Sequence, residues 1–488
     1  MPCFAVAAVY SGEQNGLDQM YYSPRRVNGR DGAMRTVRGI TVQTEGSPWR
    51  LLLLFSLPLM AGNIFQQMYT VVDTAVVGKV LGVDALAALG SVDWLNWLTL
   101  GTIQGFTQGF SILLAQRFGA GDHPGLRRAM ANAVFLSALC AMLVTAGAEL
   151  LAEPVVVLLR TPAEIRHIAM AYLRLLFAGL PVVTAYNFAA ASLRALGDGR
   201  TPLMAMIAAS LTNIALDLWF VLGLQWGVRG AAAATIIAQC LAAACCIWRL
   251  CRIEALRLTG EDCRLSGGLC GRLLKLGLPM ALQNTIIAIG GMMIQTIVNG
   301  FGVAFIAGFT ATNKLYGVLE VAATSYGYAM TTYAGQNLGA GRLDRVSRGM
   351  RAGLVIALGT SAAIAAAMLA CGRWILSWFI SGGAAQSGEA LAVAVRYLRL
   401  MSLCLPALYV LHVTRSCVQG LGNTLLPMVS GISEFIMRTG GALLLPAAMG
   451  ESGVMWAEIL AWFGADLILV PSYFYMMRRT RRRMEEGK

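Results

Sequence analysis

Two aspartates stand inside long apolar stretches of this sequence, where an ionised carboxylate is unfavourable unless something compensates it. Asp73 lies within YTVVDTAVVGKVLG, and Asp217 follows Asn213 by four residues in NIALD. In a helix, this spacing places the amide and the carboxylate on one face. Thr235 adds a hydroxyl within GAAAATIIAQ, where small residues let helices approach closely. These hard oxygen ligands suit Na⁺, and two neighbouring carboxylates also favour a shared proton.

The elements that carry these residues are predicted to be membrane helices. Hydrophobic residues make up 57% of the 488-residue chain and charged residues only 13%, about half the charged fraction of a soluble domain. The apolar residues form blocks long enough to cross a ~30 Å hydrocarbon core, separated by turns such as RFGAGDHPG and RALGDGRTP. We predict twelve helices, near 49–78, 84–115, 128–151, 164–195, 202–223, 227–250, 276–300, 303–334, 350–372, 390–418, 425–449 and 453–477.

The depths of the polar residues in these helices match. With the N-terminus in the cytoplasm, the first and fifth helices run outward and the sixth runs inward. Asp73, Asp217 and Thr235 then all lie roughly 10–14 Å beneath the outer surface. We therefore predict a cation-coupling site of Asp73, Asn213, Asp217 and Thr235. The alternative is that backbone groups or water satisfy each side chain separately.

The net charge of +13 is better explained by membrane topology than by nucleic-acid binding. About 27 of the 38 basic residues fall in loops and tails that this orientation places in the cytoplasm, and about 8 fall outside. No basic face with interleaved aromatics is present. We expect the lipid bilayer as the surrounding, both termini in the cytoplasm, and no nucleic-acid partner.

The cysteines and histidines indicate neither a metal centre nor a cofactor. The eleven cysteines lie mostly within or beside apolar runs, with no CxxC pair, and the three histidines are dispersed. We expect no cofactor and no metal beyond Na⁺ at the predicted coupling site.

The two halves of the chain repeat. GAG at 119–121 recurs at 339–341, and LGD at 196–198 recurs as LGN at 421–423, an offset of about 220–225 residues. Because each half has an even number of helices, both halves enter the membrane from the same side. The predicted fold is an all-α polytopic membrane protein: twelve transmembrane helices in two six-helix lobes, related by a pseudo-two-fold axis along the membrane normal.

This repeat divides the chain into five predicted parts. These are a disordered N-terminal extension (1–47, with Met34 as an alternative start), an amino lobe (48–251), a cytoplasmic linker (252–275), a carboxyl lobe (276–477) and a basic cytoplasmic tail (478–488).

The second half lacks the acid pair. Asp73 corresponds to Met293 or Ile294, and Asp217 corresponds to Ala442. A coupling site is therefore expected only in the amino lobe.

The carboxyl lobe keeps other charged residues. Glu434 and Arg438 have the spacing of a structural ion pair on one helix. Lys314 is the one candidate partner of Glu320 on its own helix face, so Glu320 is a secondary candidate for a proton site.

Pro58 precedes Asp73 in the same predicted helix by about fifteen residues. A proline there removes one helix hydrogen bond and permits bending. Spacing alone leaves two interpretations open, a packing kink or a hinge that responds to Asp73.

Three stretches resemble the multidrug and toxic compound extrusion (MATE) family, in its prokaryotic branch. They are LPLMAGNIFQQMYTVVDTAVVGKVLGVDALAALG, the loop AQRFGAGD with its repeat AGQNLGAGR, and RALGDGRTPL. The resemblance covers roughly residues 48–478. It implies an antiporter of the bacterial inner membrane that exports cationic or amphipathic organic compounds in exchange for Na⁺ or H⁺.

The resemblance also implies roles for single residues. Asp73, Asn213, Asp217 and Thr235 match the amino-lobe cation site of the family. Pro58 matches a proline at which the helix bends on protonation in some members. Gln67 and Tyr69 match positions that line the cavity, as does Asn187 in the fourth span. Some members also have carboxylates in the seventh and tenth helices, where this chain reads LPMALQNTIIAIGG and YVLHVTRSCVQG.

Other functions stay open at this point. A flippase or exporter of a lipid-linked saccharide or other amphiphile is the nearest alternative. A polytopic membrane enzyme would need converging His, Ser/Lys or metal-ligand clusters, and the sequence has none, so we expect a transporter, not an enzyme. We also expect a monomer.

Overall fold

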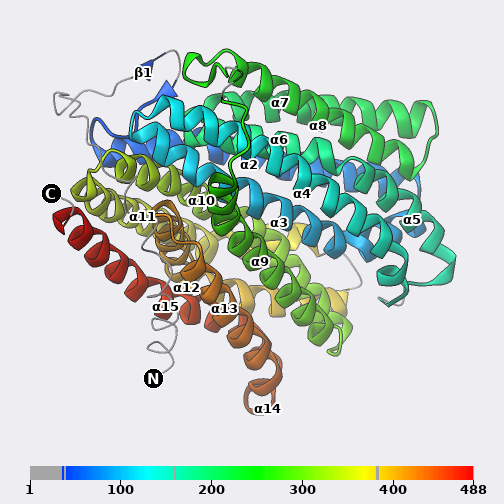
Figure 1. Cartoon of the computed structure of the whole chain (residues 1–488). Helices are drawn as coiled ribbons and strands as arrows, with labels where there is room; N and C mark the ends of the chain where they lie inside the picture. Colours follow the sequence, from blue (N-terminus) through cyan, green and yellow to red (C-terminus); the bar gives the residue numbers. More distant parts are fainter. Residues whose placement is uncertain are drawn as a thin grey trace.

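The computed structural model of this chain describes residues 36–37, 40–158, 161–258, 260, 262–380 and 384–486. Long helices that run in one general direction make up most of this part (Figure 1). A short antiparallel ribbon of β1 (Thr36–Val37) and β2 (Ile40–Thr41) precedes them.

The helices fall into two sets that follow the halves of the sequence. The first set is α2 (Pro48–Val80), α3 (Val83–Gly119), α4 (His123–Leu158), α5 (Ala163–Ala178), α6 (Leu180–Ala195), α7 (Arg200–Asp217), the π-helix η2 (Leu218–Gly223) and α8 (Val228–Cys251). After the 3₁₀ turn η3 (Glu254–Leu256), the second set is α9 (Gly267–Val298), α10 (Val303–Gly339), α11 (Leu343–Phe379), α12 (Ala384–Gly420), α13 (Leu425–Leu444), α14 (Pro446–Met449) and α15 (Glu451–Glu486).

The repeated glycine motifs end equivalent helices in the two halves. Gly121 and Gly341 have φ of 67° and 69°, and Gly197 and Gly422 have φ of 93° and 86°. Residues with a Cβ rarely adopt this left-handed conformation, which ends a helix and starts a turn. The motif repeat is therefore a repeat of backbone geometry.

The twelve predicted spans are confirmed. By length and composition, eight of the described helices could each cross a membrane, and α5 with α6, bent by 47°, would make a ninth span. The other three are α3, α10 and α13. They are less apolar because they place polar side chains inside the bundle, as α13 does with the buried Glu434 and Arg438.

The first helix of each half packs into the core of the other lobe. Four residues of α2 belong to an apolar cluster whose other buried members come from the second half: Leu51, Leu52, Phe55 and Leu59. Leu273 and Leu276 of α9 belong to the corresponding cluster of the first half. Figure 1 accordingly shows α9 between α3 and α13, which both contact it. The two lobes are thus joined by an exchange of helices.

Glycines allow α3 and α9 to approach closely. A Cβ on Gly109 would lie only 2.5 Å from the Cα of Gly277, and one on Gly105 only 2.4 Å from the Cα of Ala281. The Asn284 side chain also donates to the carbonyl of Gly101 at 2.9 Å. Backbone contact of this kind is typical of helix pairs in membranes.

The predicted disorder of residues 1–47 is wrong for residues 40–47. The N–H of Thr41 donates to the carbonyl of Gly197 in the first half (3.1 Å), and Arg345 of the second half donates to the carbonyl of Gly46 (2.8 Å). Hydrogen bonds from both halves hold this segment, so its order could not be recognised from hydrophobic periodicity. The alternative start Met34 lies outside the described residues.

Two helices extend into the segments predicted to be linker and tail. α9 begins at Gly267, inside the segment expected to be linker, and α15 continues through the basic tail as far as Glu486. Both extensions carry basic residues, and these segments were interpreted as linker and tail because they leave the apolar region. Charge marks where a span leaves the hydrocarbon, whereas backbone hydrogen bonding continues beyond that point.

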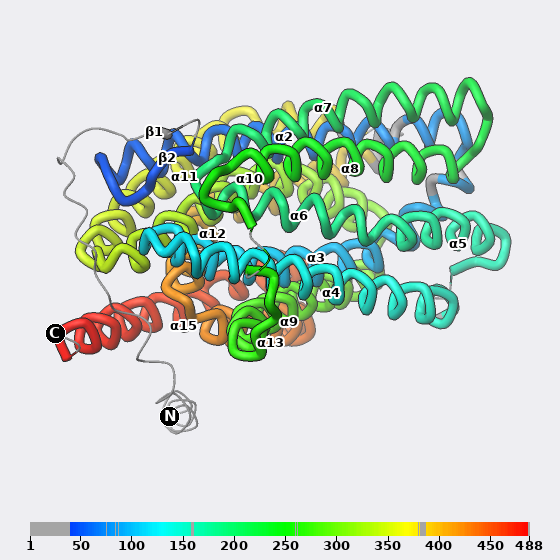
Figure 2. The backbone as a smooth tube through the Cα atoms, turned by 45° about the horizontal axis from the view of Figure 1, so that its top comes forward, coloured from blue at the N-terminus to red at the C-terminus, as the bar shows by residue number. Residues whose placement is uncertain are grey.

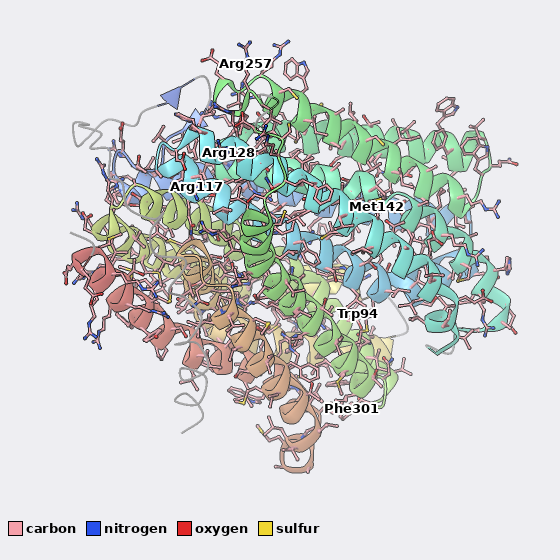
Figure 3. All side chains as sticks on the ribbon, in the orientation of Figure 1. Trp94, Arg117, Arg128, Met142, Arg257 and Phe301 are labelled. Carbon is pink, nitrogen blue, oxygen red and sulfur yellow. The ribbon has the colours of Figure 1, made fainter. Side chains whose placement is uncertain are left out.

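We call one end of the bundle the basic side. It carries the loops 120–122, 196–199, 252–258, 262–266, 340–342 and 421–424, and the C-terminal end of α15. Arg117, Arg128 and Arg257 lie toward this end in Figure 3, and Trp94 and Phe301 lie toward the opposite side. The tube in Figure 2 shows α2 starting, and α15 ending, on the basic side.

We predict that Gly109→Ala destabilises the protein, because the new methyl group would force the backbones of α3 and α9 apart. The expected loss is about 1–3 kcal/mol, measured as a lower midpoint of thermal unfolding in detergent. Gly147→Ala in α4 is the matched control, since a Cβ there meets no atom within 4 Å. Equal midpoints for the two variants would contradict the close packing of this seam.

Candidate functional site

Three helices bring together the four residues of the predicted cation site. Asp73 comes from α2, Asn213 and Asp217 come from α7, and Thr235 comes from α8. The carboxyl groups of Asp73 and Asp217 are close enough to share a hydrogen bond when one of them is protonated. The Asn213 amide nitrogen donates to the Thr235 hydroxyl at 3.4 Å. Asp73, Asn213 and Asp217 are 8%, 1% and 0% exposed, so the site is enclosed.

The oxygens of this site are acceptors without donors. Both carboxyl oxygens of Asp217, one of Asp73 and the amide oxygen of Asn213 are buried, and no group in the described part of the chain donates to them. A buried polar atom without a partner costs about 1–3 kcal/mol, and more when it is charged. A bound cation or proton would remove this penalty, since either one supplies the positive charge that the oxygens lack.

A π-helix begins directly after Asp217. Residues 218–223 form η2, so the backbone hydrogen bonds of this helix change spacing at the carboxylate. π-turns within α-helices occur frequently at functional sites. The residue types of this stretch, LWFVLG, gave no signal for it.

Two further groups near the site were missed by sequence reasoning. Tyr172 of α5 is 8% exposed and lies close enough to both Asp73 and Asp217 to interact with them electrostatically. Asp93 of α3 is exposed and interacts in the same way with Asp73 and with Lys314 of α10. A depth comparison could have found Asp93, because it lies about 15 Å from the end of its helix.

The other predicted residues stand apart from the unpaired oxygens. Tyr69 lies one turn before Asp73 on α2 and bonds to the Gln239 side chain of α8, so it borders the site. Gln67 is exposed, and its side chain points toward Gly317 of α10. These positions are compatible with the lining role expected of them.

Asn187 and Pro58 are less directly connected to the site. The Asn187 side chain donates to the carbonyl of Val183 in its own helix (2.9 Å). Pro58 lies within α2, which is one continuous helix from Pro48 to Val80. Their predicted roles in lining and in bending stay predictions.

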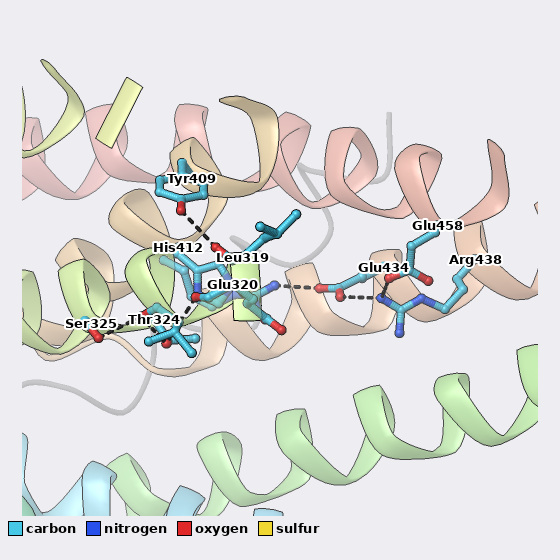
Figure 4. A network of polar contacts seen from close by, with 11 residues as sticks. Leu319, Glu320, Thr324, Ser325, Tyr409, His412, Glu434, Arg438 and Glu458 are labelled. Carbon is cyan, nitrogen blue, oxygen red and sulfur yellow. Dashed lines mark hydrogen bonds and ion pairs between the residues drawn. The ribbon is translucent and has the colours of Figure 1, made fainter. Parts of the chain in front are cut away.

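The expected ion pair of the carboxyl lobe is present. Arg438 contacts Glu434 at 3.1 Å on the same helix. The partner of Glu320 was not foreseen: it is His412 of α12, at 3.2 Å, while Lys314 lies toward Asp93. Figure 4 shows Glu320 and His412 beside the Glu434–Arg438 pair.

The two lobes are closed against each other on the basic side. The Gln336 side chain of α10 donates to the carbonyl of Ala195 (2.8 Å) and accepts from the N–H of Gln43 (3.0 Å). The Gln116 side chain of α3 donates to the carbonyl of Gly420 (3.0 Å). Toward the opposite side, Asp93 and Lys314 are exposed.

Comparison with known protein families shows which family this chain belongs to. The MatE family model matches residues 58–219 and 279–443, which is one match in each half and more than half of the chain. This chain belongs to the MATE family. Its match pattern also agrees with the internal repeat, since each half aligns to the same model.

Relatives and solved structures agree with this assignment. The probable multidrug resistance protein YpnP of Bacillus subtilis is 29% identical, over 84% of this chain and 91% of its own length. A solved MATE structure in complex with MaL6 has a TM-score of 0.83 at 22% identity, covering 92% of this chain and all of that one. A MOP superfamily transporter from Pyrococcus furiosus has a TM-score of 0.84 at 21% identity, covering 92% and 99%. The MATE fold of twelve membrane helices in two lobes is thus shared.

We predict that Gln336→Ala loosens the closed basic side of this MATE protein, because one side chain supplies two of its hydrogen bonds. The backbone amides of residues 40–46 should exchange with deuterium about tenfold faster or more, as expected for local opening. Gln295→Ala, which removes only an exposed bond to Asn299, should leave that exchange unchanged. Unaltered protection in the Gln336 variant would show that other contacts hold the segment.

Proposed function

We propose that this protein is a secondary antiporter that exports cationic or amphipathic organic compounds in exchange for Na⁺ or H⁺. One observation carries the proposal: Asp73, Asn213 and Asp217 hold buried acceptor oxygens to which none of the described residues donates. Such a site takes up positive charge. The description of YpnP as a probable multidrug resistance protein supports export of small organic compounds.

The orientation follows from the positive-inside rule. The basic side carries most of the arginines and lysines, including the five arginines at 478–483, and would therefore face the cytoplasm of a bacterial inner membrane. Both termini would then be cytoplasmic. The closed arrangement described above corresponds to the state that faces outward.

Coupling follows from competition for one negative charge. In the outward-facing state, Na⁺ or H⁺ enters the Asp73–Asp217 site and neutralises it. An organic cation held by the same carboxylates then loses its counter-charge and leaves to the outside. After the lobes reorient, loss of the coupling ion to the cytoplasm restores the charge for the next substrate. Each ligand shifts the equilibrium only through its different affinity for the two states.

α2 is suited to transmit this change in charge. It carries Asp73, while its first turns pack into the other lobe, with Pro58 in between. Because proline lacks an N–H, the carbonyl one turn earlier loses its helical partner, so bending there needs little free energy.

We predict that Asp73→Asn abolishes transport, because the amide carries no charge for either ion. Uptake of ethidium into everted vesicles should fall about tenfold or more at equal protein level in the membrane. Asp84→Asn is the control, since Asp84 is exposed at the first turn of α3. Full transport by a well-expressed Asp73 variant would refute the proposed site.

Asn213→Ala should separate Na⁺ coupling from H⁺ coupling. Na⁺ needs several oxygen ligands, and the Asn213 amide supplies one that is otherwise unpaired. Under Na⁺ coupling, the Na⁺ concentration for half-maximal ethidium transport should rise about tenfold. Under H⁺ coupling, transport driven by a pH gradient alone should persist, because a proton shared by two carboxylates does not use the amide.

This experiment carries its own controls. Asn299→Ala, at the exposed end of α9, should behave as wild type with either gradient. If neither a Na⁺ gradient nor a pH gradient alone drives ethidium transport in the wild type, the antiport proposal fails.

A further inference from the structure

A short segment before the first membrane helix crosses from one lobe to the other on the basic side. It runs from Ile40 to Gly46, and we call it the clasp. Figure 2 shows β2, where the clasp starts, at the basic end of the bundle. α2 follows at Pro48 and packs within its first turn, through Leu51, into the carboxyl-lobe core. The clasp therefore lies where the lobes separate when the basic side opens.

The first two residues of the clasp are held by the amino lobe. The N–H of Thr41 donates to the carbonyl of Gly197 (3.1 Å), in the turn that follows α6. Ile40 is half-buried against the apolar cluster of the same lobe. Gly197 has φ of 93°, and a Cβ there would collide with the carbonyl oxygen of Thr41. The contact at this end of the clasp thus depends on a glycine at position 197.

Gln43, in the middle of the clasp, is held by the carboxyl lobe. Its N–H donates to the side-chain oxygen of Gln336 of α10 (3.0 Å). Its carbonyl accepts from the side-chain amide of Asn337, the next residue of that helix (3.1 Å). Gln43 is 0% exposed. Both backbone polar groups of this buried residue are therefore bound to α10.

Two arginines of the carboxyl lobe hold the last part of the clasp. Arg342 donates to the carbonyl of Thr44, and Arg345 donates to the carbonyl of Gly46, both at 2.8 Å. The Arg345 side chain is in turn fixed by the side-chain oxygen of Asn337 (3.0 Å). Hydrogen bonds from a charged donor are roughly twice as strong as neutral ones. The carboxyl-lobe end of the clasp is thus the stronger end.

Gln336 connects the clasp to the direct closure between the lobes. Its amide nitrogen donates to the carbonyl of Ala195 in the amino lobe, while its oxygen accepts from Gln43. In the first half, Gln116 donates to the carbonyl of Gly420 at the end of α12. Because Ala195 and Gly420 occupy equivalent positions of the repeat, these two glutamine bonds are related by the pseudo-symmetry. The clasp is added to this symmetric pair at Gln336.

We propose that the clasp keeps the basic side closed, and that it stays on the carboxyl lobe and releases the amino lobe at Thr41 when that side opens. The inference rests on the proposed antiporter, which needs both states. In the described part of the chain, four hydrogen bonds hold residues 43–46 to the carboxyl lobe and one holds Thr41 to Gly197. The end with fewer and neutral bonds separates at the lower free-energy cost. Closing the basic side again then means docking Thr41 against Gly197.

The clasp thereby controls how much of the protein faces the cytoplasm. A substrate that enters from the cytoplasm binds only the open fraction of the molecules. Its apparent dissociation constant is therefore the intrinsic constant divided by that fraction. A weaker contact between Thr41 and Gly197 increases the open fraction, so a lower substrate concentration is needed for transport.

The first test weakens only the amino-lobe end of the clasp. In everted vesicles, Gly197→Ala should lower the ethidium concentration for half-maximal uptake about threefold or more. Gly121→Ala is the matched control, because Gly121 has the same left-handed conformation (φ 67°) but a Cβ there meets no atom within 4 Å. It should leave that concentration unchanged. Thr41→Pro removes the donor N–H without altering the turn at 197, and should act like Gly197→Ala.

The second test determines which end of the clasp separates. Amide hydrogen exchange is measured at single residues in the purified full-length protein in lipid nanodiscs. In the wild type, the Thr41 amide should be protected about tenfold less than the Gln43 amide, because it is freed at each opening. Gly197→Ala should reduce the protection of Thr41 further and leave that of Gln43 unchanged. Arg345→Gln, which loosens the other end, should reduce the protection of Gln43.

Each outcome decides for or against the clasp. Equal loss of protection at Thr41 and Gln43 in Gly197→Ala would overturn the inference, because the segment would then leave both lobes. An unchanged half-maximal concentration in Gly197→Ala or Thr41→Pro, at normal protein level, would also overturn it, while the antiporter proposal would stand. If wild-type vesicles take up no ethidium with either gradient, the proposed function fails, and the exchange measurement still shows which end separates.

Discussion

The structure depends on one electrostatic constraint: a carboxylate buried in a membrane protein needs a positive partner. Asp217 is fully buried, and neither of its oxygens has a donor within the described residues. Taking an ion out of water costs several kcal/mol even after the protein relaxes. No described residue donates to these oxygens, so under the proposed function the stability of this region depends on a bound cation or proton.

Because the lobes exchange their first helices, the charge at Asp73 also affects the packing of the carboxyl lobe. α2 belongs to the carboxyl-lobe core at the basic side, through Leu51 and Phe55, and to the amino lobe at Asp73. A change of charge at Asp73 therefore acts on an element that both lobes share. The basic side is closed by a few hydrogen bonds, such as those of Gln336, which can be exchanged at small free-energy cost.

The two lobes have similar backbone folds, but their buried carboxylates are compensated in different ways. In the amino lobe, no described residue donates to the buried oxygens of Asp217, and under the proposed function a cation or proton completes the site. In the carboxyl lobe, Arg415 and Arg438 neutralise Glu434 and Glu458 internally. Glu320 is partly exposed there, with a histidine as its partner. The repeat thus provides two equivalent frameworks, and the charges placed on them differ.

Much of this arrangement could be predicted from the sequence, because a bilayer makes local pattern informative. Span number follows from the length of apolar runs, and the level of Asp73, Asp217 and Thr235 follows from the constant rise of a helix. The i,i+4 pair of Glu434 and Arg438 was predicted on the same basis. Within the membrane, the depth of a side chain follows from its position along its helix, so it can be estimated from the sequence alone.

Only the tertiary structure decided which faces meet at a given depth. His412 is far from Glu320 in sequence, and Tyr172 and Asp93 join the amino-lobe acids from helices with no shared motif. Residues 40–46 are ordered by hydrogen bonds from Gln336 and Arg345, distant positions that local periodicity cannot reveal. The physical reason is rotation: sequence determines how deep a side chain lies, whereas helix packing determines the direction in which it points.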